Sequence, residues 1–87
     1  MPKLDERSRE LVAVGASVTA NCLSCLEYHV GKARESGAAA DEIREAIDVG
    51  RMVRKGAAAK LDRLSATLAE AEAAPAAAVG ATEGCCA

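Results

Sequence analysis

The chain has 87 residues, 51% of them hydrophobic, and a formal net charge of −2. This length allows one domain at most, and the lack of a basic excess disfavours nucleic-acid binding, which needs cations against phosphates. No stretch reaches the roughly 18 apolar residues of a membrane span, and the charged N-terminal residues lack the apolar segment of a signal peptide. We therefore expect a cytoplasmic protein that binds neither nucleic acid nor a membrane.

The inventory of large apolar side chains is small. Leu and Val occur seven times each, Ile twice and Tyr once, without Phe or Trp, whereas Ala occurs 21 times. A short chain buries only a modest fraction of its surface and is marginally stable alone. We therefore expect the chain to complete its core with further copies of itself, as a homo-oligomer.

Residues 5–20 are predicted to form the first helix. Apolar side chains recur there at spacings of seven, three and four, which make one helical stripe: Leu4, Leu11, Val14 and Val18. Glu10 lies at the edge of this stripe, so its carboxylate could turn inward or remain a solvated surface group. Gly15 and Ala16 are small enough to let another helix approach closely.

The second helix is predicted over residues 22–36, with Thr19 or Asn21 as its N-cap. Cys22 then lies at or near the first turn, and Cys25 lies just inside it. The predicted buried stripe consists of Leu23, Leu26, Val30 and Ala33. Because the cysteines and the histidine run beside this stripe, we expect a half-buried site in which Cys22 is the more exposed thiol.

A third helix is predicted over residues 40–55 and ends before Gly56. Its predicted inward positions are Ile43, Ile47, Gly50 and Met52 or Val53. Arg51, Arg54 and Lys55 crowd the predicted end, where cations complement the partial negative charge of a helix C-terminus. We interpret them as such a complement rather than as an anion-binding site.

A fourth helix is predicted over residues 57–73, which closes a helical domain of residues 1–73. Its apolar residues follow the 4-3-4-3 spacing of a coiled-coil seam: Ala57, Leu61, Leu64, Leu68 and Ala71. The seam suits either a contact between subunits or packing within one subunit.

Residues 74–87 are rich in Ala and Gly, and we expect a flexible tail that ends in Cys85 and Cys86. Adjacent cysteines form only a strained ring disulfide, so they more naturally exchange with another dithiol or bind a soft ion. One hypothesis is that they pass electrons, or an ion such as arsenite, copper(I) or mercury, to Cys22 and Cys25. The other is that this terminus has no function.

Cys22 and Cys25 form a Cys-x-x-Cys motif, and His29, the only histidine, lies four residues after Cys25. On a helix the imidazole and that sulfur share a face one turn apart, where the imidazole can take the thiol proton. The helix N-terminus and the histidine would both favour the reactive thiolate. The open alternatives are inert core thiols, a purely structural histidine, and a zinc site whose fourth ligand is Glu10 or a tail cysteine.

The spacing of Glu10, the Cys22 and Cys25 pair, and His29 resembles the alkyl hydroperoxidase D family, within the larger carboxymuconolactone decarboxylase-like group. The resemblance extends over residues 6–68. It implies that the two cysteines are the redox pair, that the histidine is the proton acceptor, and that the glutamate is its partner. It also implies a helical oligomer, between a dimer and a hexamer.

Ser24 marks a departure from this pattern, because peroxidase members often carry a second histidine at that position. The departure weakens the case for strong peroxidase activity more than the case for dithiol chemistry. The decarboxylase branch of the group lacks the dithiol, so the group's name does not give this chain's reaction.

We therefore predict an all-α protein of about four helices whose thiols reduce a hydroperoxide or the disulfide of a partner. Cys25 would attack the peroxide and become a sulfenic acid, and Cys22 would condense with it. A dithiol donor, either a lipoylated protein or a thioredoxin-like protein, would reset the pair, and no cofactor is expected. The alternative is a carrier of a thiophilic metal or metalloid that uses Cys22, Cys25, Cys85 and Cys86.

Overall fold

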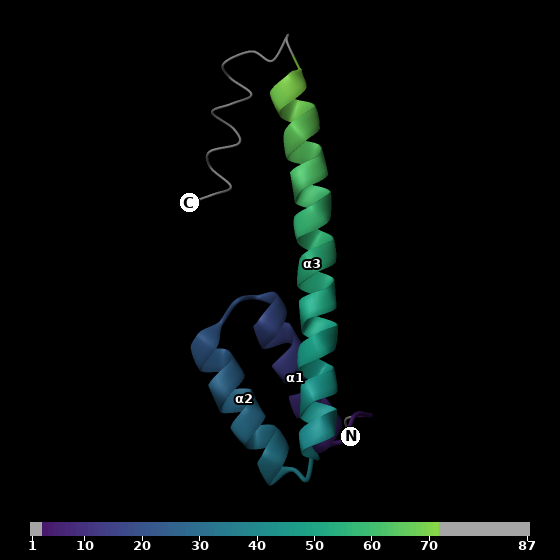
Figure 1. Ribbon diagram of the computed structural model, residues 1–87. Coiled ribbons are helices and arrows are strands. Elements are labelled where there is room, and N and C mark those ends of the chain that lie inside the picture. The colour runs from purple at the N-terminus through teal and green to yellow at the C-terminus, as the bar shows by residue number, and fades with distance from the viewer. Residues whose placement is uncertain (1–2, 72–87) are drawn as a thin grey trace. The chain divides into compact units, whose positions relative to one another are not determined.

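The structure is a computed structural model in which residues 3–71 are described. The described residues form three helices and no strand. The helices are α1 (Glu6–Thr19), α2 (Leu23–Glu35) and α3 (Ala40–Glu70), labelled in Figure 1. The prediction of an all-α protein is confirmed. The chain divides into two compact units, residues 1–57 and residues 58–87. None of the described helices combines the length and the apolar character needed to cross a membrane.

The first two helices follow the predicted bounds, 5–20 and 22–36, to within one residue at each end. Hydrogen bonds from Ser8 to the side chain of Asp5, the N-cap of α1, hold the pKa of that carboxyl below its ordinary value. After α1 the chain reverses at Asn21, whose φ of 56° lies in the left-handed region that asparagine tolerates. α1 and α2 consequently pack side by side (Figure 1).

All three helices contribute to the hydrophobic core of the first unit, and α1 contributes both Val14 and Val18. Val14 of α1, Ala33 of α2 and Ile43 of α3 pack together. Partly buried side chains surround them: Leu11, Leu26, Val30, Ala38, Ala46 and Ile47. Most of the predicted inward positions are among the buried and partly buried residues, and for these positions the prediction is confirmed.

Some predicted core positions are exposed instead, namely Leu4, Leu23, Met52 and Val53. Leu4 precedes the first helical residue, so it does not continue the stripe of α1. Leu23 is the first residue of α2 and is 83% exposed. In α3 the inward stripe continues from Gly50 to the half-buried Arg54, one helical turn later, so Met52 and Val53 lie off the stripe.

α1 and α3 cross closely at two glycines. A Cβ added to Gly50 would overlap the carbonyl oxygen of Gly15, and one added to Gly15 would lie 3.1 Å from the carbonyl oxygen of Ala46. The hydroxyl of Thr19 donates a hydrogen bond across the crossing to the Gly50 carbonyl oxygen at 2.9 Å. The prediction that Gly15 permits the close approach of another helix is confirmed.

Residues 40–70 form one continuous helix, so the prediction of two helices separated by Gly56 is wrong. A glycine inside a helix costs about 1 kcal/mol relative to alanine, but unlike proline it keeps the backbone N–H that the helix needs. Basic residues and alanines on both sides are good helix formers, so the helix continues through it. The last turn carries no basic residue. The interpretation of Arg51, Arg54 and Lys55 as a complement to a helix end is therefore also wrong.

Every described residue from Ala58 onward is exposed. The leucines of the predicted seam, Leu61, Leu64 and Leu68, are 63%, 55% and 54% exposed. A subunit contact at this seam stays a prediction, as does the end of the helical domain at residue 73. The predicted tail over residues 74–87, with Cys85 and Cys86, lies outside the described residues.

Candidate active site

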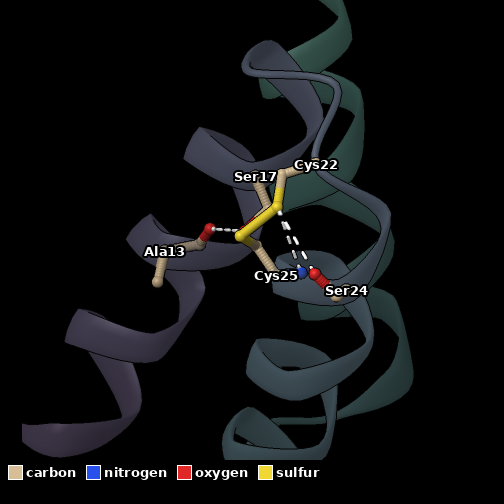
Figure 2. Close-up of a disulfide and its surroundings, with 5 residues drawn as sticks. All are labelled: Ala13, Ser17, Cys22, Ser24 and Cys25. Carbon is tan, nitrogen blue, oxygen red and sulfur yellow. Dashed lines mark hydrogen bonds between the residues drawn. A yellow bond between two sulfur atoms is a disulfide. The ribbon is translucent and has the colours of Figure 1, made fainter.

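Cys22 and Cys25 are joined by a disulfide at the start of α2, shown in Figure 2. Cys22 is the N-cap of the helix, and its sulfur accepts a hydrogen bond from the Cys25 backbone N–H at 3.3 Å. The hydroxyl of Ser24 lies 3.8 Å from the same sulfur. The prediction of Thr19 or Asn21 as the N-cap is wrong, because the left-handed residue 21 turns the chain and leaves Cys22 as the extended residue before the helix.

The N-cap position has a chemical consequence for the reduced pair. The first N–H groups of a helix lack partners within the helix and carry a partial positive charge. A thiolate on Cys22 would face these groups, which stabilise a negative charge at the N-cap. The local geometry therefore favours the charged, reactive form of this sulfur once the disulfide is reduced.

Glu10 of α1 and His29 of α2 form a hydrogen-bonded pair, with 2.7 Å between Nδ1 and Oε1. Of the two positions left open by the sequence, the carboxylate takes the inward one, and both side chains are half-buried. A carboxylate at Nδ1 fixes the ring and leaves Nε2 to exchange a proton. His29 follows Cys25 by one turn of the same helix, so the imidazole lies on the same helical face as that thiol.

The side chain of Tyr28, the residue before His29, is exposed. Its ring packs edge-on against the imidazole of His29, with 5.0 Å between the ring centroids. The ammonium of Lys32 lies 5.7 Å from the centroid of the tyrosine ring. Tyr28 therefore contacts the imidazole of His29 in addition to the hydrogen bond from Glu10.

The exposure of the two cysteines is the reverse of the prediction, because Cys25 is exposed and Cys22 is half-buried. The backbone N–H of Cys22 donates to the carbonyl oxygen of Ser17 on α1 at 3.0 Å, which holds the N-cap residue against that helix. Ser17 itself is buried, and its hydroxyl donates to the Ala13 carbonyl oxygen at 2.7 Å (Figure 2). The first turn of α2 thus presents Cys25 to solvent and keeps Cys22 near α1.

A hollow of about 330 Å³ adjoins Cys22. Its lining residues are Ser17, Val18, Asn21, Cys22, Leu23, Leu26 and Arg54. Arg54 of α3 donates from Nη1 to the Val18 carbonyl oxygen at 3.2 Å and to Oδ1 of Asn21 at 3.0 Å. The sequence analysis assigned Arg54 to a helix end and did not place it at the site, because 32 positions separate it from Cys22 and only the fold brings them to one hollow.

Among residues 3–71, no group of three or more His, Cys, Asp or Glu side chains gathers closely enough to hold a metal ion. The zinc alternative built from Cys22, Cys25, His29 and Glu10 therefore gains no support. The carrier alternative also requires Cys85 and Cys86, which lie outside the described residues.

Comparison with known proteins places the site in a family. The family model of the carboxymuconolactone decarboxylase family matches residues 2–69. The chain belongs to this family. The match includes Glu10, Cys22, Cys25 and His29, so the whole candidate site lies within the family region. The family contains alkyl hydroperoxidase D-like members and enzymes of the peroxidase and decarboxylase types.

One curated relative is "Uncharacterized protein 4 in cox locus" of Paracoccus denitrificans, which is 44% identical over 55 residues. The match covers 63% of this chain and 50% of the relative, so the chain spans about half the length of the curated relative that it matches. No solved structure matches this chain at a significant level.

Proposed function

We propose that this member of the carboxymuconolactone decarboxylase family is a thiol-dependent redox enzyme that reduces hydroperoxides or partner disulfides. Cys22 and Cys25 are the redox pair, and Glu10 and His29 are the relay that activates them. The observation that carries the proposal is the disulfide at the start of the helix whose next turn holds His29, itself hydrogen-bonded to Glu10 at 2.7 Å.

The peroxide reaction begins with the reduced pair. Nε2 of His29 takes the proton of the Cys25 thiol, and the carboxylate of Glu10 stabilises the imidazolium that forms. The thiolate attacks one peroxide oxygen, so an S–O bond forms and the O–O bond breaks. The leaving alkoxide takes the proton from His29, and the products are an alcohol and a sulfenic acid on Cys25.

Cys22 completes the oxidation. Its thiolate, favoured at the N-cap, attacks the sulfur of the sulfenic acid, and hydroxide leaves and is protonated to water. The product is the Cys22–Cys25 disulfide, the state that the structure contains. The same pair reduces a partner disulfide when the first thiolate attacks a partner sulfur instead and the second displaces the partner as a thiol.

A dithiol donor, such as a lipoylated or thioredoxin-like protein, returns two electrons to the disulfide. We propose that this cycle takes place in the cytoplasm, where thiol donors keep most cysteines reduced. A site with an exposed Cys25 suits such exchange, because the attacking and leaving sulfurs must both be reachable.

The test is a count of free thiols before and after one equivalent of an organic hydroperoxide, with the modified cysteines located by peptide mass spectrometry. We expect the loss of two thiols per chain, at Cys22 and Cys25, and an alcohol equivalent to the peroxide added. Cys25→Ser should form no sulfenic acid. A Cys25→Ser variant that still reacts while Cys22→Ser does not would reverse the two roles.

Zinc or arsenite added before the peroxide serves as the competing condition. If the thiols resist peroxide but are protected from alkylation by one equivalent of either ion, the carrier function replaces the enzyme. If neither treatment changes the count at Cys22 and Cys25, the redox proposal fails.

A further inference from the structure

The hollow beside Cys22 carries a single charged side chain. Its lining includes the apolar side chains of Val18, Leu23 and Leu26, and no Asp or Glu. Arg54 is the only cation among the seven lining residues. The reactive sulfur of Cys22 therefore shares a partly apolar hollow with one guanidinium.

The partners of Arg54 are neutral. Both of its described hydrogen bonds leave from Nη1, to the Val18 carbonyl oxygen and to the amide oxygen of Asn21. Arg7 and Arg51, in contrast, pair with the carboxylates of Glu42 and Asp48. Within residues 3–71 no carboxylate pairs with Arg54, so its charge is held in place by neutral acceptors and is not neutralised.

We infer that Arg54 determines substrate specificity at the redox pair by binding a carboxylate of the dithiol that resets the Cys22–Cys25 disulfide. The inference rests on the proposed function and narrows its donor to a dithiol with a free carboxylate beside it, which a lipoyl group linked to a protein through an amide lacks. A guanidinium has five N–H groups in a planar fork that matches a carboxylate, and its Nη1 contacts leave the Nε and Nη2 groups for a ligand. The apolar wall accommodates the hydrocarbon part of the donor.

The reduction of the disulfide then begins at Cys22, beside the hollow, and releases the exposed Cys25. A donor thiolate attacks Sγ of Cys22, a mixed disulfide forms, and the Cys22–Cys25 bond breaks with its electron pair on Cys25. Cys25 takes a proton from His29. The second donor thiol, as its thiolate, attacks the donor sulfur of the mixed disulfide, closes the donor's own disulfide and releases Cys22. Two electrons pass to the protein, and the two donor protons end on the two cysteines.

The experiment compares two donors that differ in one group, dihydrolipoate with its carboxylate and dihydrolipoamide with a neutral amide. The rate of reduction of the Cys22–Cys25 disulfide is measured for each, in a full-length background with Cys85→Ser and Cys86→Ser. Arg54→Gln should slow reduction by dihydrolipoate about tenfold, as for a partly exposed charge-assisted pair, and leave the rate with dihydrolipoamide within about twofold. Arg54→Lys should fall between, because it keeps the charge but loses the fork.

Arg51→Gln is the matched control, because it removes the same charge from an exposed position of the same helix, where the partner is Asp48. It should leave both rates unchanged. The preference of the wild-type protein for dihydrolipoate should also shrink at high salt, since salt screens exposed charges.

Equal loss with both donors in Arg54→Gln would overturn the inference, because Arg54 would then only hold the turn at Asn21. Unchanged rates with both donors would also overturn it. These two results leave the proposed function standing, since the disulfide of the wild-type protein is still reduced. A wild-type disulfide that reacts with neither donor faster than that of an unfolded peptide with the same motif would instead remove the proposed function, and the inference with it.

Discussion

The first half of α3 and its continuation differ in what covers their apolar side chains. Up to residue 57 the helix belongs to the first unit, where Ile43 is buried in the core and Gly50 is buried against Gly15. From Ala58 onward every described residue is exposed, although Leu61, Leu64 and Leu68 continue the 4-3-4-3 spacing that begins at Ala57. An apolar period therefore predicts that a helix forms, but it does not say what the apolar side of that helix packs against.

The contrast also separates two roles. The candidate site uses only residues of the first unit: Glu10, Ser17, Asn21, Cys22, Cys25, His29 and Arg54. The leucines of the second unit are exposed, and their exposure suits a surface that another chain covers. We propose that the first unit carries the redox site and that the leucine seam forms the contact between subunits.

The largest effect should come from removing that seam. Replacing Leu61, Leu64 and Leu68 together by Gln takes three apolar side chains out of the proposed subunit contact. Burying a leucine contributes about 1.5–3 kcal/mol, so the loss is several kcal/mol per chain and the oligomer should dissociate. Light scattering of the reduced protein measures this as a fall in mass to that of a monomer, while peroxide consumption per chain persists.

The matched control for the seam is the pair Ala59→Gln and Ala66→Gln, at exposed positions of the same helix outside the 4-3-4-3 spacing. Its mass should equal that of the wild-type protein. A wild-type protein that is already a monomer, or a seam variant that keeps its mass, would show that these leucines do not join subunits.

The next largest effect should come from the first half of α3, where the helix packs against α1. Gly50→Ala places a Cβ against the carbonyl oxygen of Gly15, so α1 and α3 must separate. Forcing extra atoms into a packed crossing costs about 1–3 kcal/mol, and the first unit should lose stability by about the upper value. Urea denaturation followed by circular dichroism measures the change in the free energy of unfolding.

Gly56→Ala is the control for that substitution, because a Cβ at residue 56 meets nothing within 4 Å. It should raise stability by up to about 1 kcal/mol, since alanine is the better helix former. If the two alanine variants changed stability by the same amount, the close crossing at Gly50 would not exist in solution.

The sequence predicted the all-α class and the core residues Val14, Ala33 and Ile43, because helical periodicity and local patterns reflect burial directly. It also predicted the partnership of Glu10 and His29, although only through the spacing of a known family, since nothing local says which way a carboxylate at a stripe edge will turn. The long α3 was missed because Gly56 looked like a break, whereas a lone glycine costs too little to end a helix with good formers on both sides.

The part of the site that could not be predicted depends on tertiary geometry. Cys22 is the N-cap because Asn21 takes a positive φ. By residue type, Thr19 and Asn21 were both suitable N-caps, so the sequence did not decide between the candidates. Arg54 reaches the same turn from another helix, and no spacing rule links residues so far apart in the chain. Both features arise from how α1, α2 and α3 pack.

A smaller effect is expected from Glu10→Gln, which changes the chemistry of the first unit without touching the seam. The amide keeps a hydrogen bond to Nδ1 of His29 but no longer stabilises the imidazolium. Sulfenic acid formation at Cys25 should slow by about tenfold, the equivalent of about 1.4 kcal/mol, with the oligomer mass unchanged. Stopped-flow peroxide kinetics measure the rate.

Glu6→Gln is the control for that rate, because it removes an exposed carboxylate from the same helix. Equal rates in the Glu10 and Glu6 variants would mean that the pairing of Glu10 with His29 is structural only. A fall in oligomer mass in Glu10→Gln would mean that site and assembly are not separable.

The smallest effect is the acid dependence of the contact between α1 and the start of α3. The backbone N–H of Ala39 and, secondly, the guanidinium of Arg7 hydrogen-bond the carboxylate of Glu42 and hold its pKa below the ordinary value. A carboxyl whose pKa is lower in the folded state contributes stability that is fully present above its unfolded pKa and is lost as pH falls through the lowered folded value.

Glu42→Gln should therefore flatten the fall in the midpoint of urea unfolding at acid pH. Glu45→Gln, at an exposed position in the same helix, should leave that fall unchanged. The contribution is small because the Glu42 carboxylate is only partly buried and salt screens its pairing with Arg7, so the same comparison in about 0.5 M salt should bring the wild-type and Glu42→Gln curves closer together. Curves that stayed apart at high salt would assign the difference to the neutral hydrogen bond at the start of α3, and not to charge between the two helices.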